Sequence, residues 1–318
     1  MKIINPCVEY IPQTDNTLNG IYKQIEKAGR TCYKSEDKIT EDSAETFVHR
    51  MIESNHTAML EHGTVYLIGN DDLSMNELIE HYNHNKYSIL KCLLDTTRSI
   101  SSVVVTTNLR VLVENNLLDD LKYVCTPTED HVRRITLKFT TNIGVTREGN
   151  RMRANSIAEE STRYCNYTKD RFGNEINICL PSWISGYQTE IQACRDDETE
   201  ARLYADMLTN GLDNNWNTID WYLYGISSAA YAYKQLIKLG WKPQQAREVL
   251  PLATKSDVVY TAFPHQWQHF FDLRLFGTTG IPHPNMKAIA FMARGVLIEN
   301  NLWNLVYPDG EPVLKPFK

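Results

Sequence analysis

The sequence predicts an α+β fold in a single domain that covers residues 1–318. Three observations lead to this prediction. The composition, with 42% hydrophobic and 23% charged residues, is that of an ordinary globular protein. Helix-like and strand-like patterns are interspersed without the regular alternation of a doubly wound sheet. No internal repeat, low-complexity tract or Gly/Ser linker marks a domain boundary.

Amphipathic helices are predicted wherever apolar residues recur with helical spacing. Such patterns cover about residues 16–28, 41–54, 74–86, 188–210, 219–239 and 284–300. Thr40 precedes the second pattern and is a predicted N-cap, because its hydroxyl can accept a hydrogen bond from the first free backbone N–H groups of a helix. Strands are predicted where β-branched residues cluster, at residues 64–68, 101–107 and 134–141.

Apolar runs and cysteines exclude several classes of protein. The longest apolar runs, such as Val103–Val105, are far too short to span a bilayer, and the N-terminal residues lack the apolar segment of a signal peptide. We therefore expect a soluble cytoplasmic protein with no membrane partner. The seven cysteines form no CxxC pair and show no metal-ligand spacing, which predicts reduced thiols and no metal site.

The charge is negative overall but positive in one region. A net charge of −6 argues against a nucleic-acid partner. Between His131 and Arg163, however, seven basic side chains stand against three acidic ones, so this region can hold a small anion. Neither GxGxxG nor GxxxxGK[ST] occurs. Side chains would therefore have to contact any phosphate, a task that suits the planar, always charged guanidinium of arginine.

The basic region contains the stretch RMRANSIAEESTRY, residues 151–164. If residues 144–153 form a helix, Arg147 and Arg151 lie one turn apart on one face, with Glu148 beside Arg151. That pattern alone is also typical of a solvent-exposed ladder of ion pairs.

Several motifs together resemble one enzyme family. Arg151 and Arg153 are followed, after seven further residues, by Ser161. This spacing resembles the Arg-His-Arg, seven residues, Ser signature of the flavin-dependent thymidylate synthases, and the continuation through CNYTKDRFGNE resembles their longer-chain branch. Other segments are similar to further motifs of the family, in the same order: RTCY (30–33), NHTAMLEH (55–62), AREVLP (246–251) and HFFDLR (269–274).

Three positions depart from the family pattern. Met152 stands in place of the signature histidine, and Phe263 and His265 replace an asparagine and an arginine that many members use near the flavin. In addition, Arg147-Glu148 stands where the long-chain branch tends to have His-Glu. Methionine donates no hydrogen bond, although its thioether can pack against a flavin ring.

The resemblance implies a reaction and an assembly. A methylene group passes from methylenetetrahydrofolate to dUMP, and FAD, which NADPH has reduced, delivers the hydride that completes dTMP. The family needs no cysteine nucleophile; for Cys165, two residues after Arg163, we weigh such a role against ordinary packing and favour packing. The family fold is an α+β domain that forms a homotetramer with active sites shared between subunits.

The resemblance also implies the site residues. Arg274 is the expected catalytic residue, facing the pyrimidine carbonyl and N3. The expected dUMP-binding residues are Glu148, Arg151, Glu160, Ser161, Arg163, Arg247 and Arg274. The expected FAD-binding residues are Arg30, Cys32, His56, Arg151, Met152, Arg153, Glu159, His265 and His269.

Several alternatives remain open from the sequence. Glu148 and Glu160 can instead be counter-ions, the histidines can be structural, and Arg274 can pair with Asp272 or another carboxylate and hold a helix end. Glu61-His62 is not expected to bind metal, because adjacent residues point apart on a strand. Two rival functions are a related hydroxymethylase of pyrimidine nucleotides, suggested by Met152, Phe263 and His265, and a flavin-free nucleotide-binding protein.

Overall fold

The computed structural model describes residues 1–152, 155–170, 173–187 and 216–312 of the chain. A four-stranded antiparallel sheet lies at its centre, in the order β2 (Cys7–Tyr10), β6 (Ile135–Asn142), β9 (Lys255–Ala262) and β7 (Ser156–Glu159). Every residue of β9 is buried. The fold is therefore α+β, with mixed helices and antiparallel sheet, as the sequence predicted.

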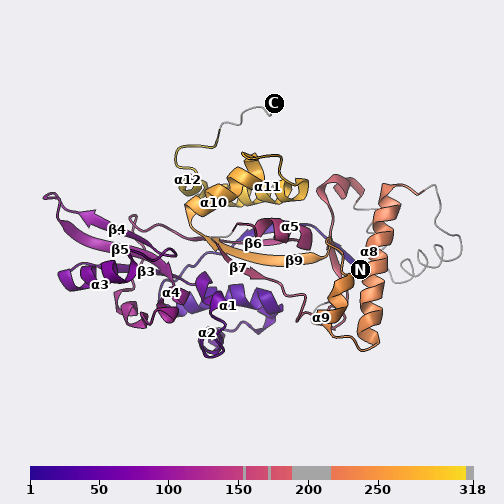
Figure 1. The fold of residues 1–318 in the computed structure, drawn as a ribbon, viewed down its shortest axis with the longest axis horizontal. Helices are drawn as coiled ribbons and strands as arrows, with labels where there is room; N and C mark the ends of the chain where they lie inside the picture. Colours follow the sequence, from indigo (N-terminus) through magenta and orange to yellow (C-terminus); the bar gives the residue numbers. More distant parts are fainter. Residues whose placement is uncertain (153–154, 171–172, 188–215, 313–318) are drawn as a thin grey trace.

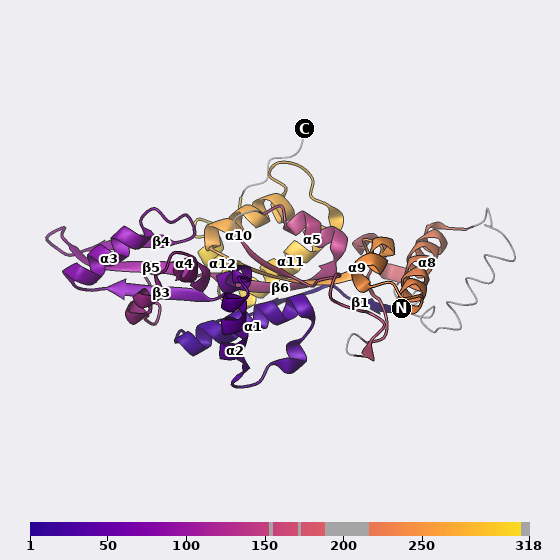
Figure 2. The same cartoon turned by 60° about the horizontal axis from the view of Figure 1, so that its bottom comes forward.

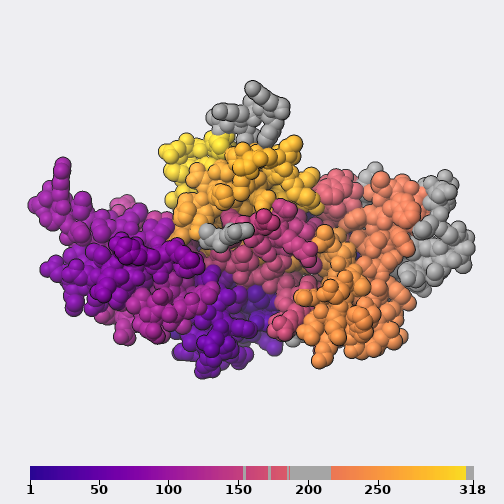
Figure 3. Space-filling view, in the orientation of Figure 1, coloured from indigo at the N-terminus to yellow at the C-terminus, as the bar shows by residue number. Residues whose placement is uncertain are grey.

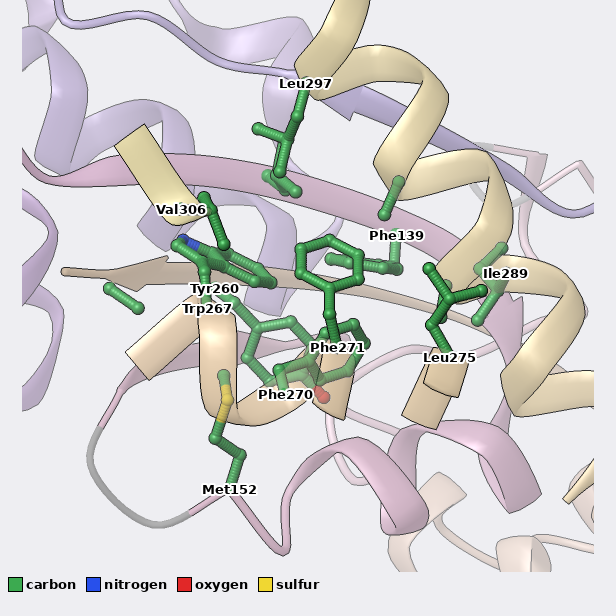
Figure 4. Packing of buried hydrophobic residues seen from close by; sticks show 14 of the residues in the cluster. Phe139, Met152, Tyr260, Trp267, Phe270, Phe271, Leu275, Ile289, Leu297 and Val306 are labelled. Atoms are coloured by element: carbon green, nitrogen blue, oxygen red, sulfur yellow. The ribbon is translucent and has the colours of Figure 1, made fainter. Parts of the chain in front are cut away.

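Helices cover both faces of the central sheet (Figure 1). One face carries α5 (Ile143–Gly149), α10 (Pro264–Phe271), α11 (Pro284–Glu299) and α12 (Trp303–Val306). The other face carries α1 (Leu18–Tyr33), and α2 (Ser43–Glu53) packs against α1. The α10 side holds a core of aromatic residues, among them Phe139, Tyr260, Trp267, Phe270 and Phe271 (Figure 4).

Two smaller units flank this centre and give the molecule its elongated outline (Figure 2). At one end, a lobe combines the antiparallel sheet β3 (Thr64–Gly69), β5 (Ile100–Asn108) and β4 (Ile89–Leu94) with α3 (Asp72–Tyr82) and α4 (Leu109–Glu114). We call this unit the N-terminal lobe; Figure 3 shows how far it projects. At the other end lie α8 (Thr218–Lys238), α9 (Pro243–Ala246) and the parallel pair β1 (Lys2–Ile4) and β8 (Asn177–Cys179).

Five of the six predicted helices and all three predicted strands are present, and the sixth helix, at residues 188–210, falls outside the described residues. The predicted N-cap Thr40 is wrong: α2 begins at Ser43 after Asp42, and the Ser43 hydroxyl accepts the backbone N–H of Thr40 instead. The described helices include none with the length and apolar character needed to cross a membrane.

Two further points about local structure differ from what the sequence analysis considered. The helix α5 ends at Gly149, so the condition under which Arg147 and Arg151 would share one helical face is not met. Gly149 packs closely against β9: a Cβ atom at this position would lie 2.5 Å from the Tyr260 hydroxyl oxygen. Glu61 and His62 lie in the 3-10 helix η2 (Thr57–His62) and not in a strand.

Candidate active site

The segment after α5 carries Arg151 and Met152 and is held in place by Glu159. The Glu159 carboxylate accepts hydrogen bonds from the Thr146 hydroxyl at 2.6 Å, the Asn150 amide at 2.8 Å and the Ser256 hydroxyl at 3.1 Å. The Tyr260 hydroxyl donates to Asn150 Oδ1 at 2.8 Å. Glu159, which we expected to contact FAD, thus fixes the residue directly before Arg151.

Arg274 faces this segment from a π-helical turn, η7 (Asp272–Phe276), that follows α10. Such turns widen a helix locally and are frequent at functional sites. The turn ends at Gly277 with φ 69°, where a Cβ atom would lie 2.8 Å from the Gly280 carbonyl oxygen, so only glycine fits. The Arg274 guanidinium donates from Nη1 to Glu148 Oε2 at 3.0 Å and from Nη2 to the Glu148 carbonyl at 2.8 Å.

These two segments enclose a cavity of about 840 Å³. One wall holds Glu148, Arg151 and Met152; the opposite wall holds the end of α10 and η7; the rim is formed by residues 279–283. Five of the expected site residues therefore meet here, namely Glu148, Arg151, Met152, His269 and Arg274. Met152 is 8% exposed and its side chain approaches Phe270 at the edge of the aromatic core (Figure 4).

A second group of expected residues lies on a different surface. Ser161 begins a tight turn in which its hydroxyl accepts the Arg163 backbone N–H at 3.3 Å and its carbonyl accepts the Cys165 N–H at 3.0 Å. The exposed Arg163 guanidinium stacks over the Tyr164 ring at 5.2 Å and donates to Gln244 Oε1 at 3.3 Å. Gln244 lies on α9, which leads directly to the exposed Arg247. We call Ser161–Tyr164 the serine turn.

Glu160 is buried beneath the serine turn, and its side chain has no exposed surface. Among the described residues its carboxylate contacts Lys255 at 2.7 Å, Lys34 at 3.5 Å and the Tyr167 hydroxyl at 3.2 Å, and it contacts none of the arginines expected to bind dUMP. Glu159 and Glu160 therefore organise opposite faces of the central sheet: Glu159 pairs in register with Val258 on the α10 side, whereas Glu160 meets Lys255 and Lys34 on the α1 side.

The other expected FAD-binding residues that the structure describes do not line the cavity. Arg30 pairs with Glu26 at 2.7 Å, and Cys32 lies 3.8 Å from the Met59 sulfur. Burial raises the pKa of the Cys32 thiol to about 12, so it stays protonated. His56 is exposed before η2, and His265 stacks on Phe263 with ring centroids 5.8 Å apart. Arg153 lies outside the described residues.

The sequence analysis did not identify Lys255, Asp257 and Tyr260. These residues of β9 support the segment that lines the cavity and the segment that carries the serine turn. The stretch KSDVVY places Lys255 and Asp257 two residues apart, hence on one face of a strand, and that pairing of opposite charges was the signal available in the sequence. Cys165, by contrast, is fully buried in an apolar cluster, as expected of a packing residue.

The fold and the cavity define an α+β protein with a cavity lined by Arg151 and Arg274. The sequence model of the thymidylate synthase complementing protein family matches residues 126–290, which is more than half of the chain. The chain therefore belongs to this family, and the resemblance to flavin-dependent thymidylate synthases is confirmed. No curated protein sequence matches it significantly.

Solved structures with weak similarity to the chain include two nucleotide-modifying enzymes. The UMP/dUMP methylase PolB from Streptomyces cacaoi, bound with 5-Br dUMP, is 14% identical over 99% of this chain and 100% of its own, with a TM-score of 0.41. The flavin dependent thymidylate synthase ThyX from Helicobacter pylori, complexed with FAD and dUMP, is 13% identical over 95% and 98% of the two chains, with a TM-score of 0.37. The family assignment rests on the sequence match.

Proposed function

We propose that the protein is a flavin-dependent thymidylate synthase, which converts dUMP to dTMP with methylenetetrahydrofolate as carbon donor and NADPH as reductant. The observation that carries this proposal is the cavity in which Arg274, presented by a π-helical turn, faces Arg151 and Met152 of the family signature. Family membership supports the same conclusion.

The cavity walls suit FAD chemically. Arg151 and His269 offer hydrogen-bond donors, while Met152, Leu273, Ile281 and Pro282 offer apolar surface on which a flat ring can rest. When bound, FAD would supply the hydride that completes the methyl group. Arg151, Met152 and His269 would hold it there, and the Met152 thioether would contribute packing instead of the hydrogen bond that a histidine gives.

Arg274 would bind the pyrimidine. Its planar guanidinium can face a carbonyl oxygen and the neighbouring ring nitrogen together. A fixed positive charge at this position stabilises negative charge that develops on the ring as it attacks the methylene donor. Glu148 holds Arg274 in the present arrangement, so the substrate would meet a guanidinium that is already oriented.

The serine turn would bind the nucleotide phosphate. Ser161, Arg163 and Arg247 supply a hydroxyl and two guanidiniums, the donors that a phosphate dianion requires. Within one chain these residues do not line the cavity that holds Arg274. A homotetramer, in which a second copy brings its serine turn to the cavity, is the assembly that would unite them.

Product analysis tests the proposal. The purified protein is incubated with dUMP, methylenetetrahydrofolate, NADPH and FAD, and the nucleotide is identified by mass. We expect dTMP. A product one oxygen heavier would mean that water intercepts the methylene adduct, the hydroxymethylase alternative suggested by Met152, Phe263 and His265. A protein that is folded yet gives no absorbance change with FAD at high micromolar concentration would contradict both enzyme proposals and leave a flavin-free binding protein.

A further inference from the structure

Lys255 is a buried cation that lies outside the cavity. It belongs to β9 and is 7% exposed. Its ammonium donates to the Glu160 carboxylate at 2.7 Å and to the Asp257 carboxylate. Burial disfavours the charged form of Lys255, but the carboxylates of Glu160 and Asp257 outweigh this effect and raise the pKa of the ammonium. Lys255 therefore remains charged at neutral pH.

The whole cluster is neutral and closely bonded. Lys255 and Lys34 supply two positive charges, while Glu160 and Asp257 supply two negative ones. Asp257 Oδ1 also accepts the Thr140 hydroxyl at 2.7 Å. Buried ion pairs of this kind seldom stabilise a fold more than apolar residues of similar size would, because desolvation offsets the attraction. What they do require is one particular geometry, so a positional role is the better explanation for their presence here.

The cluster is bonded to both ends of the serine turn. Glu160 directly precedes the turn, and its backbone N–H donates to the Asp257 carbonyl at 2.7 Å. Tyr167 follows the turn, and its hydroxyl donates to the same Glu160 carboxylate at 3.2 Å. The turn is thus closed at its base by one carboxylate, and the orientation of that carboxylate depends on Lys255.

We propose that Lys255 is a positioning residue, which acts through Glu160 to set the serine turn in the conformation that presents Ser161 and Arg163 to the phosphate of a nucleotide. This inference rests on the proposed function, since it takes the serine turn to be the phosphate site. It assigns Glu160 to the support of that site and not to direct contact with the sugar or with the arginines.

The test compares Lys255→Met, which removes the charge and keeps the length of the side chain, with Lys255→Arg, which keeps the charge. Lys122→Met is the matched control, because Lys122 forms an exposed ion pair with Glu77 at 3.0 Å in the N-terminal lobe. Affinities are measured for dUMP, for deoxyuridine, which lacks the phosphate, and for FAD. By analogy with residues that orient metal ligands, whose loss weakens binding about 10-fold or more, we expect a loss of dUMP affinity of this size in Lys255→Met.

The test depends on which of the three affinities changes. We expect little change in deoxyuridine and FAD affinity in Lys255→Met, partial recovery of dUMP affinity in Lys255→Arg and no change in Lys122→Met. Equal losses for all three ligands would show that Lys255 only supports the fold, and an unchanged dUMP affinity would also overturn the inference. If Lys255→Met does not fold, Tyr167→Phe, which removes one hydrogen bond to Glu160, replaces it. This variant should lose dUMP affinity selectively as well, but to a smaller extent.

The pH dependence provides a second readout. Without Lys255, Glu160 and Asp257 would face each other, with Lys34, Tyr167, Lys138 and Cys179 as the other titratable groups nearby. A proton can then replace the lost cation, so the dUMP affinity of Lys255→Met relative to the native protein should recover as the pH falls from 8 to 5.5. A constant ratio would contradict the inference. Failure of the native protein to bind dUMP would instead contradict the proposed function.

Discussion

Arg274 and Glu148 are joined at two points, through the Glu148 side chain and through its backbone carbonyl, at 3.0 and 2.8 Å. The sequence left open that Arg274 pairs with Asp272 or another carboxylate and only holds a helix end; the carboxylate it contacts is that of Glu148. Asp272 is instead bonded to the Tyr307 hydroxyl at 2.7 Å. The π-helical turn thus separates the two residues and directs only the arginine toward the cavity.

Arg274→Lys should retain the fold and much of the dUMP affinity but lose turnover. Lysine keeps the positive charge but cannot bond Glu148 and a pyrimidine edge with one planar fork. By analogy with the loss of one donor that stabilises a transition state, we expect a rate about 10²–10³-fold lower. The measurement is single-turnover oxidation of pre-reduced flavin at saturating dUMP. Arg294→Lys, at an exposed pair with Glu311, is the control; a near-normal rate in Arg274→Lys would refute the electrostatic role.

Arg163→Ala should weaken dUMP binding more than FAD binding. Arg163 is exposed, and its described contacts are Gln244 and the Tyr164 ring, so its guanidinium can reach a ligand at little cost. A charge-assisted hydrogen bond contributes about 1.5–3 kcal/mol, which sets the expected loss. Calorimetric titration of both ligands measures it, with Arg110→Ala in the N-terminal lobe as the control. Equal losses for dUMP and FAD would indicate that Arg163 supports the assembly.

Cys165→Ser should lower stability without abolishing dTMP formation. Cys165 is fully buried in an apolar cluster, and a hydroxyl placed there costs about 1–3 kcal/mol of unfolding free energy. Because the proposed route needs no thiolate, each of the other six cysteines should also tolerate serine. Thermal unfolding and product formation are measured together. Loss of turnover in Cys165→Ser with intact binding of flavin and dUMP would reveal a covalent step.

His62 should make the protein less stable in acid. It is fully buried, and Nδ1 lies 2.8 Å from the Thr261 hydroxyl oxygen. Burial, reinforced by the nearby Arg134 charge, lowers the pKa of His62 to about 3, so between pH 3 and about 6.5 the unfolded chain binds a proton that the folded chain does not. Unfolding free energy therefore falls as the pH falls through that window, by up to about 1.4 kcal/mol per pH unit.

Denaturant unfolding at several pH values checks this. His62→Gln should show a smaller slope of stability against pH between 4 and 6 than the native protein. His49→Gln, at an exposed position near Glu45, should leave the slope unchanged. If His62→Gln has the native slope, other groups control the acid sensitivity.

Local patterns in the sequence were sufficient for the long elements. The helix predicted at 284–300 spans Pro284–Glu299, and the strand predicted at 101–107 spans Ile100–Asn108, since both carry their periodicity within themselves. The buried central strand β9 was missed because Lys255 and Asp257 interrupt its apolar run, and those charges are tolerated only because each finds a partner in the folded chain.

The candidate site was likewise predicted from the sequence only in part. The signature motif and HFFDLR identified Arg151 and Arg274, which meet across the cavity although 123 positions separate them. The close packing of Gly149 against the Tyr260 hydroxyl could not be predicted, because the two residues lie 111 positions apart in the sequence. The same is true of Glu160, whose partner lies 95 residues away. Pairings over such distances leave no periodic trace in the sequence.

Successive side chains of β9 point to opposite faces of the sheet, so one set supports the residues next to the cavity and the other set supports the serine turn. Asp257 and Thr261 point to the α1 side, where they meet Lys255 and His62, while Ser256 and Tyr260 point to the α10 side, where they bond Glu159 and Asn150. A single inserted residue within β9 would exchange its two faces. The residues next to the cavity and those beneath the serine turn would then lose their hydrogen-bond partners together.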